Sequence, residues 1–510
     1  MTEHVLTVDL GTSGPKVALF TLDGAYVDGD FTPVPLDVVA DGGVEQSPDA
    51  WWAGIVGAAQ RVMDRGTVGP PDVVAVAVTS QWSGTVAVDP DGVPLHDAII
   101  WMDARGAAAT REMVGGPVRV QGYDPRKLRT WIARTGGAPA LSGKDSISHI
   151  WWLQRERPEV ARATWKFLEP KDWLNLKLTG RCAATFDSII LHWVTDNRDP
   201  ARIDYDPELL RISGVSRAQL PDLVAATSVL GELTDLAAKE LGLRAGIPVV
   251  GGTPDLQSAA IGSGAVRNHE GHLYVGTSSW LTCHVPFKKT DLFHGIATLP
   301  SPLPGTYYVA DEQEVAGGCL DWLRDHALET SDDFAALDAR AAAIPAGSNG
   351  VLFTPWLNGE RTPVDDHTLR AGWHNLSLAT TRGELVRSVL EGVAFNSRWL
   401  LGTVERFVKR PFPWLHFIGG GAQSPLWCQI MADVLDREIR QVEHPIRANA
   451  RGAALLAGIA LEHITVADLA RHVHVVETYR PDPAHRKVYD EGYKEFRVLH
   501  KQTHRRTKSA

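Results

Sequence analysis

The sequence predicts an α/β protein with two large domains of similar plan. The chain has 510 residues, of which 44% are hydrophobic. This length exceeds what one ordinary core holds, and the apolar content is enough for two cores. Short apolar runs that predict buried strands alternate with helical patterns along the chain. A strand pattern followed by a Gly-Thr-Ser turn occurs at residues 5–13 and again at residues 272–278. This repetition indicates that the two halves share one design.

Charge and composition limit the classes of partner. The formal net charge is -10 and the pI is near 6.0, which argues against a nucleic-acid surface and suits a cytoplasmic enzyme. No apolar run reaches the roughly 20 residues of a membrane span, and the first residues lack a signal-peptide pattern, so we expect no membrane and a cytoplasmic location. The four cysteines form no CxxC pair, so neither a zinc site nor a disulfide framework is indicated. A solvated end is expected for the basic tail residues His500, Lys501, His504, Arg505, Arg506 and Lys508.

The first hairpin is a candidate phosphate site. Residues 5–10 and 17–20 predict strands, and residues 11–16 predict a glycine-rich turn between them. The groups available to a phosphate are the main-chain N–H groups and the side chains of Thr12, Ser13 and Lys16. Asp9 at the strand end has the chemistry to hold a hydrated Mg²⁺. The alternative is an ordinary β-turn, and the stretch is not a Walker A loop because its spacing differs and no helix follows.

Two predicted strand ends place an aromatic residue beside hydrogen-bonding side chains. The strand at 73–78 runs into the polar stretch 79–85, and the strand at 98–101 ends just before Asp103 and Arg105. This combination is typical of a site that stacks against a sugar or polyol. The candidate residues are Gln81, Trp82, Ser83, Trp101 and Asp103. The alternative puts the tryptophans in the core and makes Asp103 and Arg105 a surface pair.

Periodicity predicts the other elements of the first half. Residues 49–63 have a helical pattern that starts after Ser47 and a proline. Residues 149–180 are predicted to be helical and to end at Gly180, a residue type suited to a C-cap. Residues 196–222 are predicted to form an irregular connection with one short helix.

Asp255 stands where a predicted strand, residues 247–250, passes through Gly251 and Gly252 into a predicted helix. A carboxylate at a helix start is a preferred N-cap. A carboxylate held at the rim of a cleft also serves as a general base. Both interpretations remain open from this stretch alone.

The second half repeats the first and adds two glycine-rich helix entries. The turn at 276–279 follows a predicted strand, and two such turns facing one cleft would hold phosphates from both sides; the alternative is two coincidental hairpin turns. The glycines at the start of 317–323 and of 419–425 allow close approach of a flat ligand such as an adenine ring. Residues 382–398 predict an amphipathic helix.

Seven short motifs, taken together and in this order, resemble the FGGY family of carbohydrate kinases, and within it the xylulokinase-like members. The motifs are residues 9–16 (DLGTSGPK), 101–105 (WMDAR), 170–174 (PKDWL), 252–255 (GTPD), 276–279 (GTSS), 359–363 (GERTP) and 419–422 (GGGA). The resemblance covers nearly the whole chain. Agreement of this many motifs in order is not a chance event.

The resemblance implies a two-domain actin-like ATPase fold, also described as ribonuclease H-like, with a central catalytic cleft. It implies ATP and Mg²⁺ as cofactors, a sugar or polyol as substrate, and Asp255 as the base that takes the proton from the attacking hydroxyl. It assigns ATP binding to Gly11, Thr12, Ser13, Lys16, Gly276, Thr277, Gly317, Asp321, Gly420, Gly421 and Ala422, and the metal to Asp9. We expect a sugar-binding half at 1–254, a nucleotide-binding half at 255–485, and a C-terminal helix with a basic tail at 486–510. A homodimer is one assembly open to such a protein.

The chain departs from the xylulokinase-like pattern in its first sugar loop. Those members carry Met-His-Gly after the glutamine, whereas Trp82, Ser83 and a glycine follow Gln81 here. The substrate is therefore expected to be a ketopentose such as xylulose or a related polyol, with glycerol, a tetritol or a hexulose as alternatives. A non-catalytic actin-like nucleotide-binding protein is the rival from another class, and Asp255 argues against it because a pure binder needs no base.

Overall fold

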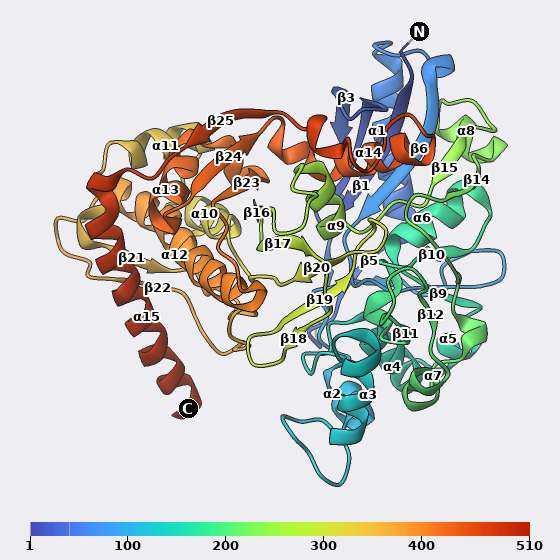
Figure 1. The fold of residues 1–510 in the computed structure, drawn as a ribbon, viewed down its shortest axis with the longest axis horizontal. Helices are drawn as coiled ribbons and strands as arrows, with labels where there is room; N and C mark the ends of the chain where they lie inside the picture. Colours follow the sequence, from blue (N-terminus) through green and yellow to red (C-terminus); the bar gives the residue numbers. More distant parts are fainter. Residues whose placement is uncertain (1, 40, 510) are drawn as a thin grey trace.

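The computed structural model describes residues 2–39 and 41–509, and it has two halves, each built around a β-sheet (Figure 1). The first sheet has six strands in the order β14-β15-β6-β1-β2-β3. Their bounds are β1 His4–Gly11, β2 Gly14–Thr21, β3 Tyr26–Phe31, β6 Val73–Ser80, β14 Val229–Glu232 and β15 Pro248–Val250. The predicted hairpin at residues 5–20 is confirmed as β1 and β2, and its register places Asp9 opposite Lys16.

The second sheet has eight strands in the order β18-β19-β20-β17-β16-β23-β24-β25. Their bounds are β16 Gly271–Val275, β17 Ser279–Val285, β18 Thr290–Asp291, β19 Ile296–Pro300, β20 Tyr307–Ala310, β23 Trp414–Ile418, β24 Glu438–Val442 and β25 Val475–Tyr479. Strand β16 pairs antiparallel with β17 and parallel with β23, just as β1 pairs antiparallel with β2 and parallel with β6. The shared plan predicted for the two halves is confirmed.

Shorter strands lie outside the two main sheets. One small sheet contains β4 Asp37–Val38, β5 Val44–Gln46 and β8 Ala98–Ile99. The pairs are β7 Val86–Val88 with β9 Lys166–Leu168, β10 Ala183–Thr185 with β13 Asp222–Val224, β11 Thr195–Asp196 with β12 Asp204–Tyr205, and β21 Leu352–Thr354 with β22 Gly372–His374. Most of them belong to the part of the first half that lies between β6 and β14.

The helices pack around these sheets, and their ends follow local sequence signals. The helices are α1 Pro48–Asp64, α2 Ala107–Val114, α3 Pro125–Thr135, α4 Ser146–Glu156, α5 Pro158–Ala163, α6 Pro170–Thr179, α7 Pro207–Ser213, α8 Asp235–Leu241, α9 Asp255–Gly262, α10 Gly318–Trp322, α11 Phe334–Ala342, α12 Arg382–Val408, α13 Pro425–Leu435, α14 Ala448–Ala460 and α15 Arg486–Ser509. Ser47 caps α1 by accepting from the Ala50 N–H, and Gly180 ends α6 in the left-handed region at φ 71°. A capping box of Thr381 and Glu384 starts α12, which continues past the end predicted at residue 398.

The prediction of one helical stretch over 149–180 is wrong in its middle. The stretch divides into α4, α5, β9 and α6. Pro158 and Pro170 each stand at the first position of a new helix, because proline fits a helix start and interrupts a helix interior. Between them β9 pairs with β7.

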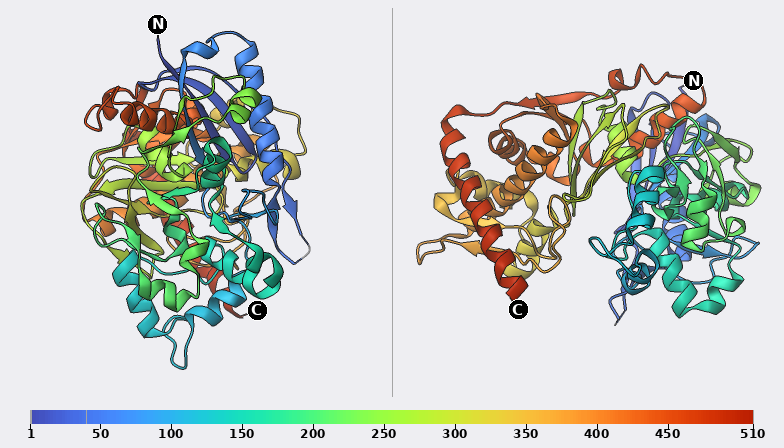
Figure 2. Two further views of the ribbon diagram at one scale, coloured as in Figure 1. Left: turned by 90° about the vertical axis from the view of Figure 1, so that its right-hand side faces the viewer. Right: turned by 60° about the horizontal axis from the view of Figure 1, so that its bottom comes forward.

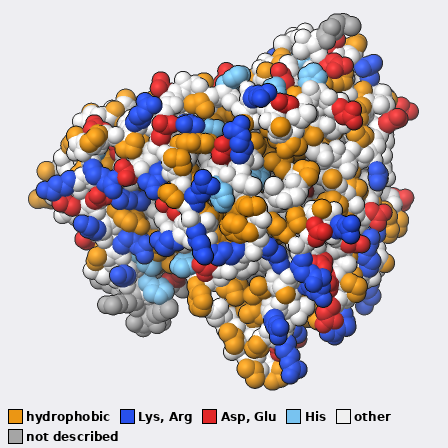
Figure 3. All heavy atoms as spheres, in the orientation of Figure 1, with side chains coloured by type: hydrophobic (Ala, Val, Ile, Leu, Met, Phe, Trp, Pro, Cys, Tyr) orange, Lys and Arg blue, Asp and Glu red, His pale blue; other side chains and the backbone are white. Residues whose placement is uncertain are grey.

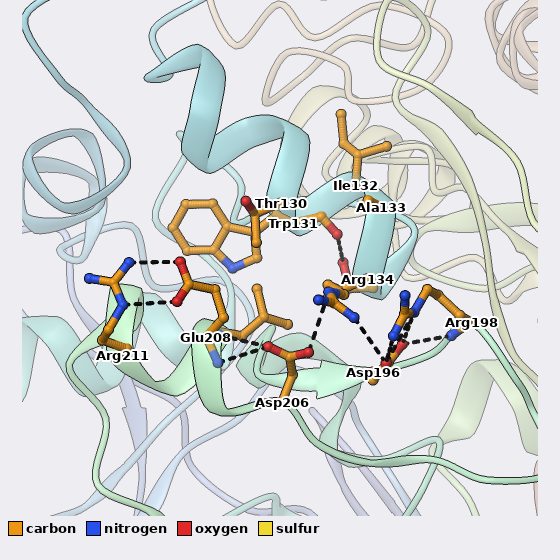
Figure 4. A network of polar contacts seen from close by, with 12 residues as sticks. Thr130, Trp131, Ile132, Ala133, Arg134, Asp196, Arg198, Asp206, Glu208 and Arg211 are labelled. Atoms are coloured by element: carbon orange, nitrogen blue, oxygen red, sulfur yellow. Dashed lines mark hydrogen bonds and ion pairs between the residues drawn. The ribbon is translucent and has the colours of Figure 1, made fainter.

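The region predicted as an irregular connection with one short helix, 196–222, contains that helix as α7 and also contains β12, the end of β11 and the start of β13. Figure 4 shows the polar network that fastens it to α3. Arg134 lies 3.5 Å from a carboxylate oxygen of Asp196 and 3.4 Å from one of Asp206. Asp206 also caps α7 by accepting from the backbone N–H groups of Glu208 and Leu209. Ion pairs and a helix cap thus add to the apolar packing of Tyr205, Leu209, Val215 and Leu220 in ordering this segment.

The C-terminal helix α15 is confirmed, but its last part is not wholly solvated as expected. Figure 2 shows α15 on the outer side of the second half. The His500 ring is only 8% exposed and packs 4.6 Å from the Trp399 ring, and His504 bonds to the Asp366 carboxylate. The tail therefore anchors on its own half through aromatic packing and an ion pair. The side chains of the other predicted tail residues, Arg505, Arg506 and Lys508, lie outside the described residues.

The surface carries both signs of charge. Figure 3 shows Lys and Arg side chains interspersed with Asp and Glu side chains over one face. Pairs such as Arg65–Asp28, at 2.7 Å, join them. Within residues 2–39 and 41–509, no helix combines the length and apolar character that crossing a membrane would require.

Helix α14 joins the two halves. It comes late in the chain, yet its alanines pack with the first sheet in one apolar cluster that includes Val5 and Val250. It crosses α9, where a Cβ on Gly452 would lie 2.0 Å from the Ser258 carbonyl oxygen and one on Gly262 would lie 1.8 Å from the Ala448 oxygen. Only glycine allows this backbone contact, which fixes the helix that begins at Asp255.

We predict that Gly452→Ala lowers the free energy of unfolding by about 1–3 kcal/mol or more, because the added methyl group must separate two packed helices. Gly57→Ala in α1 is the matched control, since its Cβ would meet only the flexible end of Arg61, at 3.4 Å. Denaturant unfolding measures both. Equal stabilities for the two variants would contradict the close crossing.

Candidate active site

The site is built from strand ends and the turns that follow them. In the first half, the β1–β2 turn contains Gly11, Thr12 and Ser13, with Ser13 exposed. The Thr12 hydroxyl accepts from the Trp101 indole N–H at 2.9 Å and lies 3.2 Å from the Gln81 amide oxygen. The turn predicted to hold phosphate therefore touches two residues predicted to hold the sugar.

Asp9 and Lys16 face each other beside this turn. Asp9 is 2% exposed, and its carboxylate lies 3.4 Å from the Lys16 ammonium, which is 34% exposed. In the described part of the chain this is the one side-chain hydrogen bond of Asp9. The pair leaves both groups with capacity for a charged ligand.

The second half brings its predicted nucleotide residues together in the same way. The Gly276 and Thr277 carbonyl oxygens accept from the Gly317 and Gly318 N–H groups, at 2.7 and 3.2 Å, which fastens the β16–β17 turn to the start of α10. A Cβ on Gly317 would lie 2.4 Å from the Gly276 oxygen, so glycine is required there. Asp321, one turn into α10, is half-exposed.

The glycines after β23 complete this side of the site. Gly420, Gly421 and Ala422 form a 3₁₀ turn at the carboxyl end of β23, the parallel neighbour of β16. Gly420 is exposed, and a Cβ atom added to it would meet open space. A Cβ atom added to Gly421 would lie 2.9 Å from the Val275 side chain. Carboxyl ends of adjacent parallel strands are the usual place for a ligand in α/β proteins.

Asp255 is the first residue of α9, and the expectation that it caps this helix is wrong. Pro254 occupies the N-cap position, and no side chain caps the helix. An Asp255 carboxylate oxygen accepts only from the Leu256 N–H, at 2.8 Å, which is the next residue. One carboxylate oxygen therefore stays free of hydrogen bonds within the described residues. The side chain is partly exposed, so it is reachable.

The surroundings of Asp255 favour a protonated carboxyl group. Burial and the negative charges of Asp9 and Glu312 raise the pKa of Asp255 from 3.8 to about 8, while the Leu256 N–H and Lys16 oppose the rise. A carboxylate with a raised pKa is a stronger proton acceptor. Such a shift is typical of functional sites, so Asp255 is a candidate functional residue.

Side chains of α6 hold the turn that precedes Asp255. The Gly251 carbonyl oxygen accepts from the Lys171 ammonium at 3.0 Å and from the Asn175 amide at 2.9 Å, both on α6. Lys171 is fully buried and pairs with Asp172 at 2.5 Å. Gly252 adopts φ 67°, and a Cβ on it would overlap the Val78 carbonyl oxygen at 1.9 Å. The glycine pair is thus a steric requirement of the turn.

The three residues of the predicted sugar loop are engaged with the protein itself. Gln81 donates to Gln46 at 2.9 Å. The Trp82 indole N–H donates to the Ser188 carbonyl oxygen at 2.9 Å, and the Ser83 hydroxyl donates to the Lys144 carbonyl oxygen at 2.7 Å. Gln81 also contacts Thr12 of the first turn, but the polar groups of all three residues already have partners within the protein.

The alternative of a surface pair at Asp103 and Arg105 is wrong, because both are buried. Asp103 accepts from the Val44 N–H at 2.9 Å and from the Arg105 side chain at 2.9 Å, and Arg105 also pairs with Glu45. The Arg105 guanidinium stacks on the Trp152 ring at 4.0 Å. Both Asp103 oxygens are occupied by this buried structure.

A charged cluster across the two halves was missed by sequence reasoning. Lys144 in the first half lies 3.0 Å from Glu314 in the second half. Arg361 pairs with Glu314 and with Glu312, and its guanidinium lies 5.1 Å from the centre of the Trp101 ring. Arg361 belongs to the GERTP motif, but no local pattern marks the other three, because they meet only in the folded chain.

Comparison with known proteins defines the class. Solved structures of the two-domain actin-like ATPase fold match the whole chain; xylulose kinase from Rhodospirillum rubrum matches with a TM-score of 0.81 and 26% identity over 99% of this chain and 100% of that one. The FGGY carbohydrate kinase profiles match residues 4–262 for the N-terminal domain and 272–461 for the C-terminal domain. The chain therefore belongs to the FGGY family of carbohydrate kinases, and the predicted fold is confirmed.

Curated relatives carry different substrate names at similar distance. A protein named xylulose kinase from Staphylococcus epidermidis is 27% identical over 98% of this chain and 97% of its own length. A protein named gluconokinase from Bacillus subtilis is 25% identical over 98% and 94%. The chain is thus an ATP-dependent sugar kinase, and identity at this level does not select among the substrates.

We predict that Asp255→Asn stabilises the protein in a pH-dependent way. A folded-state pKa of about 8 against 3.8 means that the contribution of Asp255 itself to stability is most favourable below pH 3.8 and falls as the pH rises towards 8. Asparagine does not ionise, so the variant does not lose stability in this way. The melting temperature of the variant minus that of the wild type should therefore increase from pH 3.8 to about pH 8 and then stay constant. A gain that is constant with pH would contradict the raised pKa.

Proposed function

We propose that this kinase transfers the γ-phosphoryl group of ATP to a hydroxyl of a ketopentose or related polyol, with Asp255 as the general base. The observation that carries the proposal is a partly exposed carboxylate at the start of α9 with a free oxygen and a pKa raised to about 8. It lies near the first phosphate-type turn, since its pKa responds to Asp9 and Lys16. Proton removal at the attacking hydroxyl is the task such a group performs.

The two turns supply the binding of the nucleotide in this proposal. Gly11, Thr12, Ser13 and Lys16 bind phosphate from the first half, and Gly276 and Thr277 bind it from the second half. Gly317, Asp321, Gly420, Gly421 and Ala422 bind the adenosine. Main-chain N–H groups and one ammonium suit the spread negative charge of phosphoryl transfer. Residues 1–254 and 255–485 are accordingly the sugar and nucleotide halves.

The residues also fit Mg²⁺. Asp9 offers a nearly buried carboxylate whose side chain makes a single long contact, at 3.4 Å, in the described part of the chain. Magnesium is commonly bound by one or two carboxylates together with substrate phosphates, so a cage of several acidic side chains is not required. When bound, Mg²⁺ would neutralise phosphate charge, and Asp9 would hold it.

The alternative of a non-catalytic nucleotide-binding protein is disfavoured by family membership and by Asp255. Kinases for glycerol, a tetritol or a hexulose remain alternatives within the family. A panel of ketoses and polyols with Mg-ATP distinguishes them. Turnover of no panel member would contradict the proposal.

Asp255→Asn tests the base directly. The amide keeps the size of the side chain but cannot accept the proton, so we expect kcat to fall by about 10²-fold or more. ATP binding, measured by calorimetry, should stay within about twofold because Asp255 does not bind the nucleotide. Retained phosphoryl transfer would remove Asp255 from its role.

The pH dependence gives an independent check. Asp255 works as a base only when ionised, so kcat/KM for the sugar should rise with pH towards about 8, the pKa of the free protein, and then level off. The binding of positive charge nearby would move the corresponding limb of kcat to lower pH. Initial rates across the pH range measure both. A kcat/KM that is flat below pH 8 would be inconsistent with this assignment.

A further inference from the structure

The residues that replace the family's sugar-reading pair do not present free polar groups. Ser83 donates its hydroxyl hydrogen to the Lys144 carbonyl oxygen at 2.7 Å and has a left-handed backbone with φ 62°. Trp82 donates its N–H to Ser188. The Ser83 hydroxyl therefore acts on Lys144 and is not presented to a ligand.

Lys144 has spare hydrogen-bonding capacity at the boundary between the halves. Its side chain is 17% exposed, and in the described residues its ammonium makes one hydrogen bond, to Glu314 at 3.0 Å. An ammonium group has three donors, so two remain for a ligand. Burial, with the positive charge of Arg361, lowers the pKa of Lys144, and Glu314 opposes this by stabilising the charged form.

Glu312 faces the same region from the second half. Its side chain is 28% exposed and is held by Arg361. Its negative charge is one of the causes that raise the pKa of Asp255. Arg361 is itself fixed by Glu314 and lies 5.1 Å from the Trp101 ring, which bonds to Thr12 of the first turn. The cluster thus adjoins Trp101, one of the predicted sugar residues, and reaches the first turn through it.

The charges of the cluster balance. Lys144 and Arg361 are matched by Glu312 and Glu314, and each cation has an anionic partner. A substrate carboxylate would meet no unpaired cation and would lie near Asp9 and Asp255 as well. Donors and acceptors in equal measure suit the hydroxyl groups of a neutral ligand.

We propose that Lys144 and Glu312 bind hydroxyl groups of the substrate from opposite halves, that Ser83 is a positioning residue acting through Lys144, and that the substrate is a neutral ketose or polyol and not a sugar acid. This inference rests on the proposed kinase function, and it adds the residues that bind the substrate and the exclusion of sugar acids.

The test compares Lys144→Met, Glu312→Gln and Ser83→Ala in the full chain. Lys144→Met leaves Glu314 paired with Arg361, so no carboxylate is left without a cation. We expect the first two variants to raise KM for the neutral sugar by about tenfold or more, and KM for ATP to stay within about twofold. Ser83→Ala should raise the sugar KM by about threefold alone and by nothing further in the Lys144→Met background, since a positioning effect needs its target.

Lys288→Met is the matched control. Lys288 also connects the halves, donating to the Ile132 and Ala133 carbonyl oxygens at 3.0 and 2.6 Å, beside the network of Figure 4. Its sugar KM should equal that of the wild type. An equal rise in this variant would mean that any contact between the halves has the effect, which would overturn the role of Lys144 as a binding residue.

Three further results would overturn the inference. These are additive effects of Ser83→Ala and Lys144→Met, a raised Mg²⁺ requirement in place of a raised sugar KM in Glu312→Gln, and wild-type turnover of gluconate as efficient as that of D-xylulose, glycerol or erythritol. Wild-type turnover of no substrate would instead contradict the proposed function. Calorimetric measurement of sugar binding to the same variants distinguishes failure of this inference from failure of the proposed function. It measures the contribution of Lys144 and Glu312 to sugar affinity without requiring turnover.

Discussion

The structure depends on the fixed turn that joins β15 to α9. Lys171 and Asn175 bind the Gly251 carbonyl oxygen from below, and Gly252 fits against the Val78 backbone where no side chain could. A fully buried lysine paired with a carboxylate costs desolvation free energy, and its hydrogen bond to the turn is what that arrangement provides. The turn sets where Asp255 stands, and the glycine crossing of α9 with α14 holds the helix behind it.

In the proposed mechanism, Asp255 makes the folded protein less stable in exchange for its role as the base. Burial and the negative charges of Asp9 and Glu312 raise the pKa of the Asp255 carboxyl group. Ionisation of this group is therefore unfavourable for the folded protein. The same environment makes the carboxylate a better proton acceptor and suits a site that receives cations and phosphates. The cluster of Lys144, Glu314 and Arg361 shows the opposite arrangement, in which charges from both halves are paired.

Much of the fold could be predicted because its signals are local. The β1–β2 hairpin, the Ser47 cap of α1 and the end of α6 at Gly180 are each determined by neighbouring residues in the sequence. The repeated Gly-Thr-Ser turns predicted the shared plan of the two halves. The division of 149–180 was missed although Pro158 and Pro170 mark two of the new helix starts, whereas β9 depends on pairing with the distant β7. The interpretation of Asp255 as a cap failed for a local reason, since the adjacent Pro254 occupies the cap position. Lys144 and Glu314 are far apart in sequence, so no pattern could have joined them.

A structure of the protein with the phosphorylatable sugar and an unreactive ATP analogue tests the central claim most directly, through the distance from the free Asp255 carboxylate oxygen to the attacking sugar hydroxyl. The account predicts about 2.6–3.2 Å, a hydrogen bond, with the γ-phosphate between the two Gly-Thr-Ser turns. A hydroxyl bonded to another side chain, with Asp255 out of reach in the closed complex, would contradict it.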